Sequence, residues 1–210
     1  PGQQEIYYLT GERLESLRNS PQIEGFTRRG IEALLFTDHV DDFWVNVVRD
    51  YKGKVLKSVT RADIKLDDIA KDGKEKPEPT PDDADVTALC ARIKTILGDK
   101  VKDVRVTGKL TESAVCLAVE EGAMDMRLER FLIEQKQLQS ATAKILEVNP
   151  SHPIIKTLTQ RAASSSDEDE VADIVWLLFD QARILEGEDI VDPAAFTRRL
   201  QRFVEKSLAA

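Results

Sequence analysis

The sequence is poor in the residues that disulfides and metal sites need. Its 210 residues include two cysteines and two histidines. Cys90 and Cys116 lie far apart in apolar surroundings, so we expect two reduced core residues rather than a disulfide or a metal pair. His39 has no second histidine or cysteine at ligand spacing. We therefore expect no metal site.

The sequence also lacks the usual features of three functional classes: membrane or secreted proteins, nucleic-acid binders and nucleotide-binding enzymes. No apolar run reaches the roughly 20 residues of a membrane span, and no signal peptide is seen. The net charge is −8 with acids and bases mixed, whereas a binder of nucleic-acid phosphates needs a concentrated basic face. The first strand-to-helix turn, Thr10-Gly11-Glu12, has neither a glycine-rich phosphate loop nor a Walker lysine. We expect a cytoplasmic protein without a membrane or nucleic-acid partner, and a small-molecule enzyme ranks low.

The first 66 residues alternate between strand and helix patterns. Apolar strands are predicted at 5–9, 31–36 and 55–60, with helices between them. The order β-α-β-α-β predicts a small three-layer α/β unit. The acidic residues of its second helix, Asp41 and Asp42, suit the positive end of the helix dipole better than metal or acid–base chemistry.

Two neighbouring aromatic residues lie on that second helix. Phe43 and Trp44 must point about 100° apart. A unit this small has no room to bury both, which predicts that one of them is exposed at a contact surface. Partial burial of both is the alternative.

A change in composition divides the chain. Residues 67–82 are charged and proline-rich, which predicts a linker because they offer little to bury. We expect one domain at 1–66 and a second, α+β domain at 83–210. The second domain combines a helix at 86–97 with a three-stranded sheet and ends in a pair of helices.

The stretch from Gly122 to about Leu138 carries the clearest functional signal. One face of the predicted helix holds four large apolar side chains, Met124, Leu128, Phe131 and Leu138, and Leu132 lies at the edge of that face. Met126 and Ile133 line up on the opposite face. A three-stranded sheet cannot cover both faces, and exposed faces containing methionine are adaptable binding surfaces. Two alternatives are open: both faces belong to the core, or dimerisation covers the second.

The last forty residues predict two helices with more apolar surface than one small domain can cover. Residues 174–179 are apolar all the way round, so this helix is buried on more than one side. Gly187 separates it from a helix that Asp192 caps and Pro193 begins. Two copies meeting as a four-helix bundle would cover the surplus; a buried hairpin in a monomeric core is the alternative. The expected dimer interface has eight residues: Ile174, Leu177, Leu178, Leu185, Phe196, Leu200, Phe203 and Val204.

The order of several motifs resembles the ninety-kilodalton heat-shock chaperones, with the bacterial HtpG type the closest fit. Five motifs resemble the end of their middle domain: residues 5–11 (EIYYLTG), Asn19-Ser20-Pro21, Gly30-Ile31-Glu32, Thr37-Asp38 and Val40-Asp41-Asp42. Five more resemble their carboxy-terminal dimerisation domain: residues 101–105 (VKDVR), 147–150 (EVNP), His152-Pro153, 178–182 (LFDQA) and Asp192-Pro193. The resemblance covers nearly the whole chain in the right order.

That resemblance implies a homodimer held by the last two helices, and an ATP-driven clamp that binds non-native client proteins. It implies client contacts on the amphipathic helix at Met124, Leu128, Phe131 and Leu132. A middle-domain aromatic also contributes; Phe43 aligns where relatives tend to have tryptophan, and the neighbouring Trp44 shares or takes over that role. A dimerisation module without client contact is the alternative.

The resemblance also bears on catalysis. The family's ATP site and catalytic arginine lie in earlier parts, so we expect no ATPase activity and no cofactor in this chain, and ATP with Mg in its parent. The first residue is Pro1 rather than methionine, and we expect a piece of a longer protein rather than a processed product. The end at Ala210 lacks the acidic co-chaperone-binding tail of eukaryotic members, which favours a bacterial source; other co-chaperones remain candidate partners.

Overall fold

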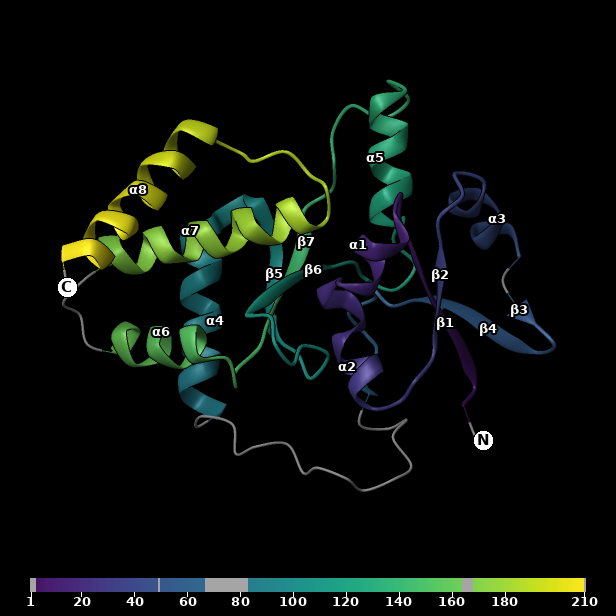
Figure 1. Ribbon diagram of the computed structural model, residues 1–210, viewed down its shortest axis with the longest axis horizontal. Coiled ribbons are helices and arrows are strands. Elements are labelled where there is room, and N and C mark those ends of the chain that lie inside the picture. The colour runs from purple at the N-terminus through teal and green to yellow at the C-terminus, as the bar shows by residue number, and fades with distance from the viewer. Residues whose placement is uncertain (1–2, 49, 67–82, 164–167, 210) are drawn as a thin grey trace.

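The computed structural model describes residues 3–48, 50–66, 83–163 and 168–209. The chain forms a mixed α/β fold with two small sheets, and each sheet has its own helices (Figure 1). The predicted linker at 67–82 lies outside the described residues. The proposed division into two domains stays a prediction.

The N-terminal part, residues 3–66, contains the first sheet. Its elements are β1 (Glu5–Thr10), α1 (Leu14–Arg18), the 3-10 turn η1 (Pro21–Ile23), α2 (Glu24–Arg28), β2 (Ala33–Phe36), α3 (Asp41–Val47), β3 (Asp50–Tyr51) and β4 (Lys54–Ser58). The strand order is β2-β1-β4-β3; β1 pairs in parallel with β2 and β4, and β3 runs antiparallel to β4. The three predicted strands are present. The two-residue strand β3 was not predicted, and the three-layer arrangement stays a prediction.

The C-terminal part, residues 83–209, contains the second sheet. Its elements are α4 (Asp83–Leu97), the 3-10 turn η3 (Gly98–Lys100), β5 (Val101–Val106), β6 (Val115–Ala118), α5 (Met126–Glu134), β7 (Lys144–Val148), α6 (Pro153–Ala163), α7 (Glu168–Leu185) and α8 (Pro193–Ala209). The predicted three-stranded sheet is confirmed, with β7 at its centre, parallel to β5 and antiparallel to β6.

Each part has its own hydrophobic cluster. In the N-terminal part Tyr7 of β1 packs edge-on against Phe26 of α2, with ring centroids 4.9 Å apart. In the C-terminal part α4 packs against β5, α6 and α7, and every residue of β7 is buried. Cys90 and Cys116 are free and buried, as the sequence predicts.

Helix α7 is buried on more than one side, as its composition predicts. The core side of α7 carries five buried apolar residues: Val171, Val175, Leu178, Phe179 and Ala182. Helix α8 packs on α7 and has no fully buried residue. The two helices converge near the C-terminus, at the end of the molecule farthest from the first sheet (Figure 1). The four-helix bundle stays a prediction, since it requires a second copy.

The predicted helix over 122–138 is shorter at both ends. Asp125 caps it, because its side chain accepts a hydrogen bond from the backbone N–H of Arg127 at 2.9 Å. At the other end Lys136 takes a left-handed conformation with φ of 57°. Met124 and Leu138 therefore lie outside the helix, and the predicted bounds were wrong by several residues.

Candidate functional site

Helices α3 and α5, one from each part of the chain, contact each other. The Phe43 and Phe131 rings meet edge-to-face, with centroids 5.3 Å apart. Beside them Arg127 Nε lies 3.0 Å from Asp42 Oδ2. The two segments with predicted client residues are thus neighbours in space. Sequence patterns place each segment on a helix but give no information about which helices meet.

The predicted client residues differ in exposure. Phe43 and Met124 are 43% and 40% exposed, whereas the other three predicted residues of this surface, Leu128, Phe131 and Leu132, are half-buried. Trp44 is half-buried as well, because its Nε1 donates to Asp41 Oδ1 at 2.7 Å and its ring packs on Phe36. Of the two neighbouring aromatics, Phe43 is the exposed one. We call Phe43, Met124, Leu128, Phe131 and Leu132 the apolar junction surface.

Helix α5 is firmly fixed to the C-terminal part. Met126 lies in the hydrophobic cluster of that part. Glu129 is buried, pairs with Lys144 and accepts hydrogen bonds from the Thr142 backbone N–H and hydroxyl. Burial alone would raise the pKa of Glu129, but the bonds from Lys144 and Thr142 outweigh it and lower this pKa. The charged form of Glu129 therefore holds α5 against the loop before β7.

Glu24 of α2 joins the two parts of the chain. Its Oε2 accepts hydrogen bonds from the backbone N–H groups of Thr111, Glu112 and Ser113 at 2.8, 2.9 and 3.1 Å. The Ser113 hydroxyl donates to Oε1. Against the opposing effect of burial, these bonds lower the pKa of Glu24. Consecutive N–H groups around one carboxylate form a backbone nest, so Glu24 is a structural anchor.

A second anchor involves Gln22 and Glu186. Gln22 Nε2 donates to the Leu117 carbonyl oxygen and to Glu186 Oε1, both at 2.7 Å. Arg130 of α5 donates to the Glu186 carbonyl oxygen at 2.6 Å. Burial of the carboxyl group raises the pKa of Glu186 to about 7. The end of α7 is therefore tied both to the N-terminal part and to α5.

A network of charges fixes α8 on α7. Arg199 lies 3.3 Å from Asp173 and stacks over the Trp176 ring at 5.1 Å. Lys206 lies 3.0 Å from Glu170 of α7. The predicted cap is confirmed, since Asp192 Oδ1 accepts from the Ala195 N–H at 2.9 Å. These contacts lie on one side of α8 and leave Leu200, Val204 and Leu208 exposed.

The eight predicted dimer residues fall into three groups. Leu185, Leu200 and Val204 are exposed, and Leu178 packs inside the core of its own chain. Four are half-buried: Ile174, Leu177, Phe196 and Phe203. Three further apolar residues outside this set are exposed, namely Ile184, Val191 and Leu208, and of these Leu208 lies on the apolar stripe that the sequence predicts for the second helix. No contact between copies tests this set.

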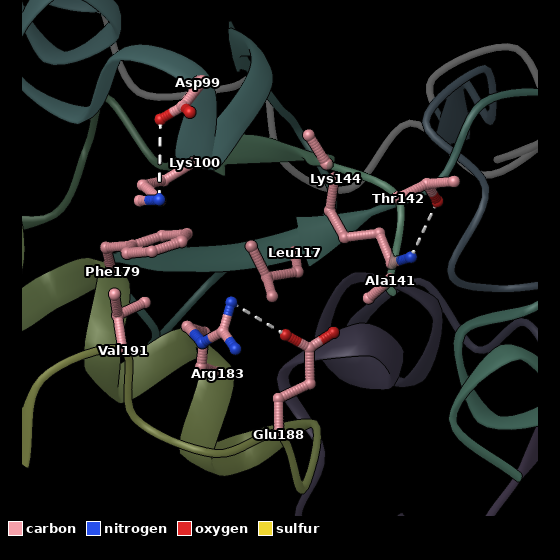
Figure 2. Close-up of a pocket in the computed structure, with 11 residues that line it drawn as sticks. Asp99, Lys100, Leu117, Ala141, Thr142, Lys144, Phe179, Arg183, Glu188 and Val191 are labelled. Atoms are coloured by element: carbon pink, nitrogen blue, oxygen red, sulfur yellow. Dashed lines mark hydrogen bonds and ion pairs between the residues drawn. The ribbon is translucent and has the colours of Figure 1, made fainter. Parts of the chain in front are cut away.

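A cavity of about 350 Å³ lies between η3, the loop before β7 and α7 (Figure 2). Leu117 and Phe179 line it. Its charged groups are already paired, Arg183 with Glu188 at 3.2 Å and Lys100 with Asp99 at 3.6 Å. In the described ranges we find no group of side chains that could hold a metal ion, and none of the described helices is long and apolar enough to cross a membrane.

Comparison with known proteins identifies the family. The family model described as Hsp90 protein matches residues 1–210. The chain is 47% identical over 208 residues to "Chaperone protein HtpG" of Wolbachia pipientis wMel, covering 98% of this chain and 33% of the relative. It is 48% identical over 208 residues to the HtpG of Rickettsia bellii (strain OSU 85-389), covering 99% and 33%. The chain thus spans about a third of the length of these relatives, and it belongs to the Hsp90 family of chaperone proteins.

Proposed function

We propose that this chain forms the dimerisation region, and part of the client-binding surface, of an HtpG-like chaperone. The observation that supports this most is the apolar junction surface, where Phe43 and the apolar face of α5 meet and remain partly exposed. Methionine side chains adapt to differently shaped partners. That property suits the binding of non-native proteins, which expose varied apolar segments.

The partner that we propose for α7 and α8 is a second copy of the chain. Leu200, Val204 and Leu208 lie one turn apart on α8 and are 46%, 50% and 84% exposed. Apolar residues at this spacing form the stripe by which helices associate. Two α7–α8 pairs packed as a four-helix bundle would cover the stripe in both copies.

The full-length protein is proposed to be an ATP-dependent clamp in the cytoplasm. The HtpG relatives are about three times as long as this chain, which leaves room for an ATP-binding part elsewhere in the full-length protein. We expect ATP and Mg to bind in the part of that protein outside residues 1–210, so that this chain alone needs no cofactor and hydrolyses no ATP. Its expected partners are non-native clients, a second copy and co-chaperones, with neither nucleic acid nor membrane among them.

A dimerisation module without client contact is the second candidate. It is favoured by the half-buried state of Leu128, Phe131 and Leu132, which the single chain already covers in part. A small-molecule enzyme ranks far lower, because the charges around the cavity at Leu117 and Phe179 are paired with each other.

Binding of a permanently unfolded protein separates the two candidates. Reduced, carboxymethylated α-lactalbumin carrying a fluorophore is titrated with the 210-residue chain and with the Met124→Ser/Leu128→Ser variant. We expect the variant to bind about tenfold or more weakly, because two apolar side chains no longer gain burial. The matched control is Val106→Ser, which removes an exposed apolar residue of β5. Equal binding by all three proteins would favour the dimerisation module alone.

A further inference from the structure

The two sides of the apolar junction surface differ in how firmly they are held. Helix α5 is fixed by Met126 in the core and by Glu129 with its bonds to Lys144 and Thr142. Helix α3 has seven residues, and Val45 is its one fully buried apolar side chain. Val47, another apolar residue of α3, is exposed. Short, thinly packed segments have the lowest local stability in a fold, so α3 is the side that can move.

The ion pair between the two helices is incompletely bonded. Asp42 and Arg127 are nearly buried, and Nε lies 3.0 Å from Oδ2. Asp42 Oδ1 and Arg127 Nη1 are also buried, but neither has a hydrogen-bond partner among the described residues. Burial raises the pKa of Asp42 more than Arg127 lowers it. A buried ion pair offsets its desolvation only when its remaining groups are bonded, so this pair gains from water once the helices separate.

We propose that the α3–α5 contact is an autoinhibitory latch on the client surface, in which Phe43 packs on Phe131, Asp42 pairs with Arg127, and α3 moves away when a client segment enters. This inference rests on the proposed function, because it describes how the same surface is regulated. An apolar or aromatic client side chain replaces the contact that Phe43 and Phe131 make with each other. Water then reaches the Asp42 carboxylate and the Arg127 guanidinium.

The latch makes a specific prediction about affinity. If only the open state binds, the apparent Kd equals the intrinsic Kd divided by the open fraction. Any change that favours the open state without altering the binding residues therefore tightens client binding. A contact that merely builds the site would have the opposite effect, because opening it would disrupt the binding surface.

Two variants open the latch from opposite sides. Arg127→Ala leaves the Asp42 carboxylate buried and unpaired, and Asp42→Ala does the same to the Arg127 guanidinium, so both favour separation of the helices. Arg105→Ala is the matched control, since it removes an arginine from an exposed pair with Asp103 on β5. Because the opening variants act on different helices, misfolding of one leaves the other informative.

Hydrogen exchange of residues 41–47 and titration of fluorescent carboxymethylated α-lactalbumin are measured on each 210-residue protein. We expect both opening variants to exchange their α3 amides about tenfold faster and to bind the probe at least about threefold more tightly, with Arg105→Ala unchanged. Faster exchange with equal or weaker binding would overturn the latch, as would unchanged exchange. The Met124→Ser/Leu128→Ser variant tests the proposed function separately: if it leaves probe binding unchanged, the client surface itself is wrong, whatever the latch variants do.

Discussion

Lys109 and Glu147 form a buried ion pair, with Nζ 2.7 Å from Oε2 and side chains 2% and 3% exposed. Lys109 Nζ also donates to the Arg61 carbonyl oxygen at 2.9 Å. This ion pair of the C-terminal part is therefore hydrogen-bonded to the last segment of the N-terminal part. Cys116 Sγ donates to Glu147 at 3.6 Å. The pair thus links β7, the loop after β5 and the segment after β4.

Removing one partner of this pair should destabilise the fold strongly. Lys109→Met leaves the Glu147 carboxylate buried without a counter-charge, which costs about 3–5 kcal/mol. The free energy of unfolding should fall clearly less in the double variant Lys109→Met/Glu147→Leu, because no buried charge remains. Urea unfolding followed by circular dichroism measures both free energies. Equal losses in the single and the double variant would contradict this account of the pair.

Loss of the Glu24 anchor should lower the stability of the fold and change the pH dependence of that stability. Glu24→Gln replaces a carboxylate that accepts three backbone N–H bonds, at a cost of about 1–3 kcal/mol. The pKa of Glu24 is lowered in the folded chain, so its contribution is present above the unfolded value of about 4.3 and is lost as pH falls through the folded pKa.

Urea midpoints at pH 7 and in the acid range below about pH 4.3 test this. The difference between the unmodified chain and Glu24→Gln should be large at neutral pH and should shrink as pH falls. Glu15→Gln on α1 is the control, since Glu15 lies on an exposed face. A difference that stays constant over the whole pH range would rule out the carboxylate as the source.

The contribution of Glu186 to stability should change with pH in the opposite direction to that of Glu24. Its folded pKa of about 7 lies above the unfolded value, so the folded state holds the proton more tightly. The stabilisation is fully present below about pH 4.3 and is lost as pH rises through about 7. Glu186→Gln mimics the protonated form and should therefore be more stable than the unmodified chain at pH 8, and the difference between the two should be clearly smaller at pH 5. Thermal unfolding at the two pH values measures this, and a variant less stable at pH 8 would contradict it.

The sequence was most informative where a pattern is local. Spacings of three and four residues placed α4, α7 and α8, and Asp192 with Pro193 marked where α8 begins. Local capping also explains the failure at α5, where the Asp125 side chain starts the helix two residues after Met124. That cap fits a known preference and could have been recognised.

Contacts between distant segments could not be predicted from one sequence. Glu24 bonds residues almost ninety positions away, and Gln22 bonds Glu186 from 164 positions away. Hydrophobic periodicity records which side of an element is buried, but not which charged groups share a site. A charged residue within an apolar strand, such as Glu147 in β7, was the one local sign of the buried pair. The meeting of Phe43 with Phe131 likewise required the fold.

Helices α7 and α8 are proposed to join two copies of the chain, and the mass of the protein in solution tests this most directly. Light scattering at about 10 μM, a concentration that populates stable dimers, is measured on the chain and on Leu200→Glu/Val204→Glu. The control, Leu34→Glu/Val55→Glu, adds the same charge at exposed apolar residues of the N-terminal part. We predict twice the chain mass of 23.6 kDa for the chain and the control, and a folded species of single mass for the α8 variant. A folded, unmodified chain of single mass would contradict the account.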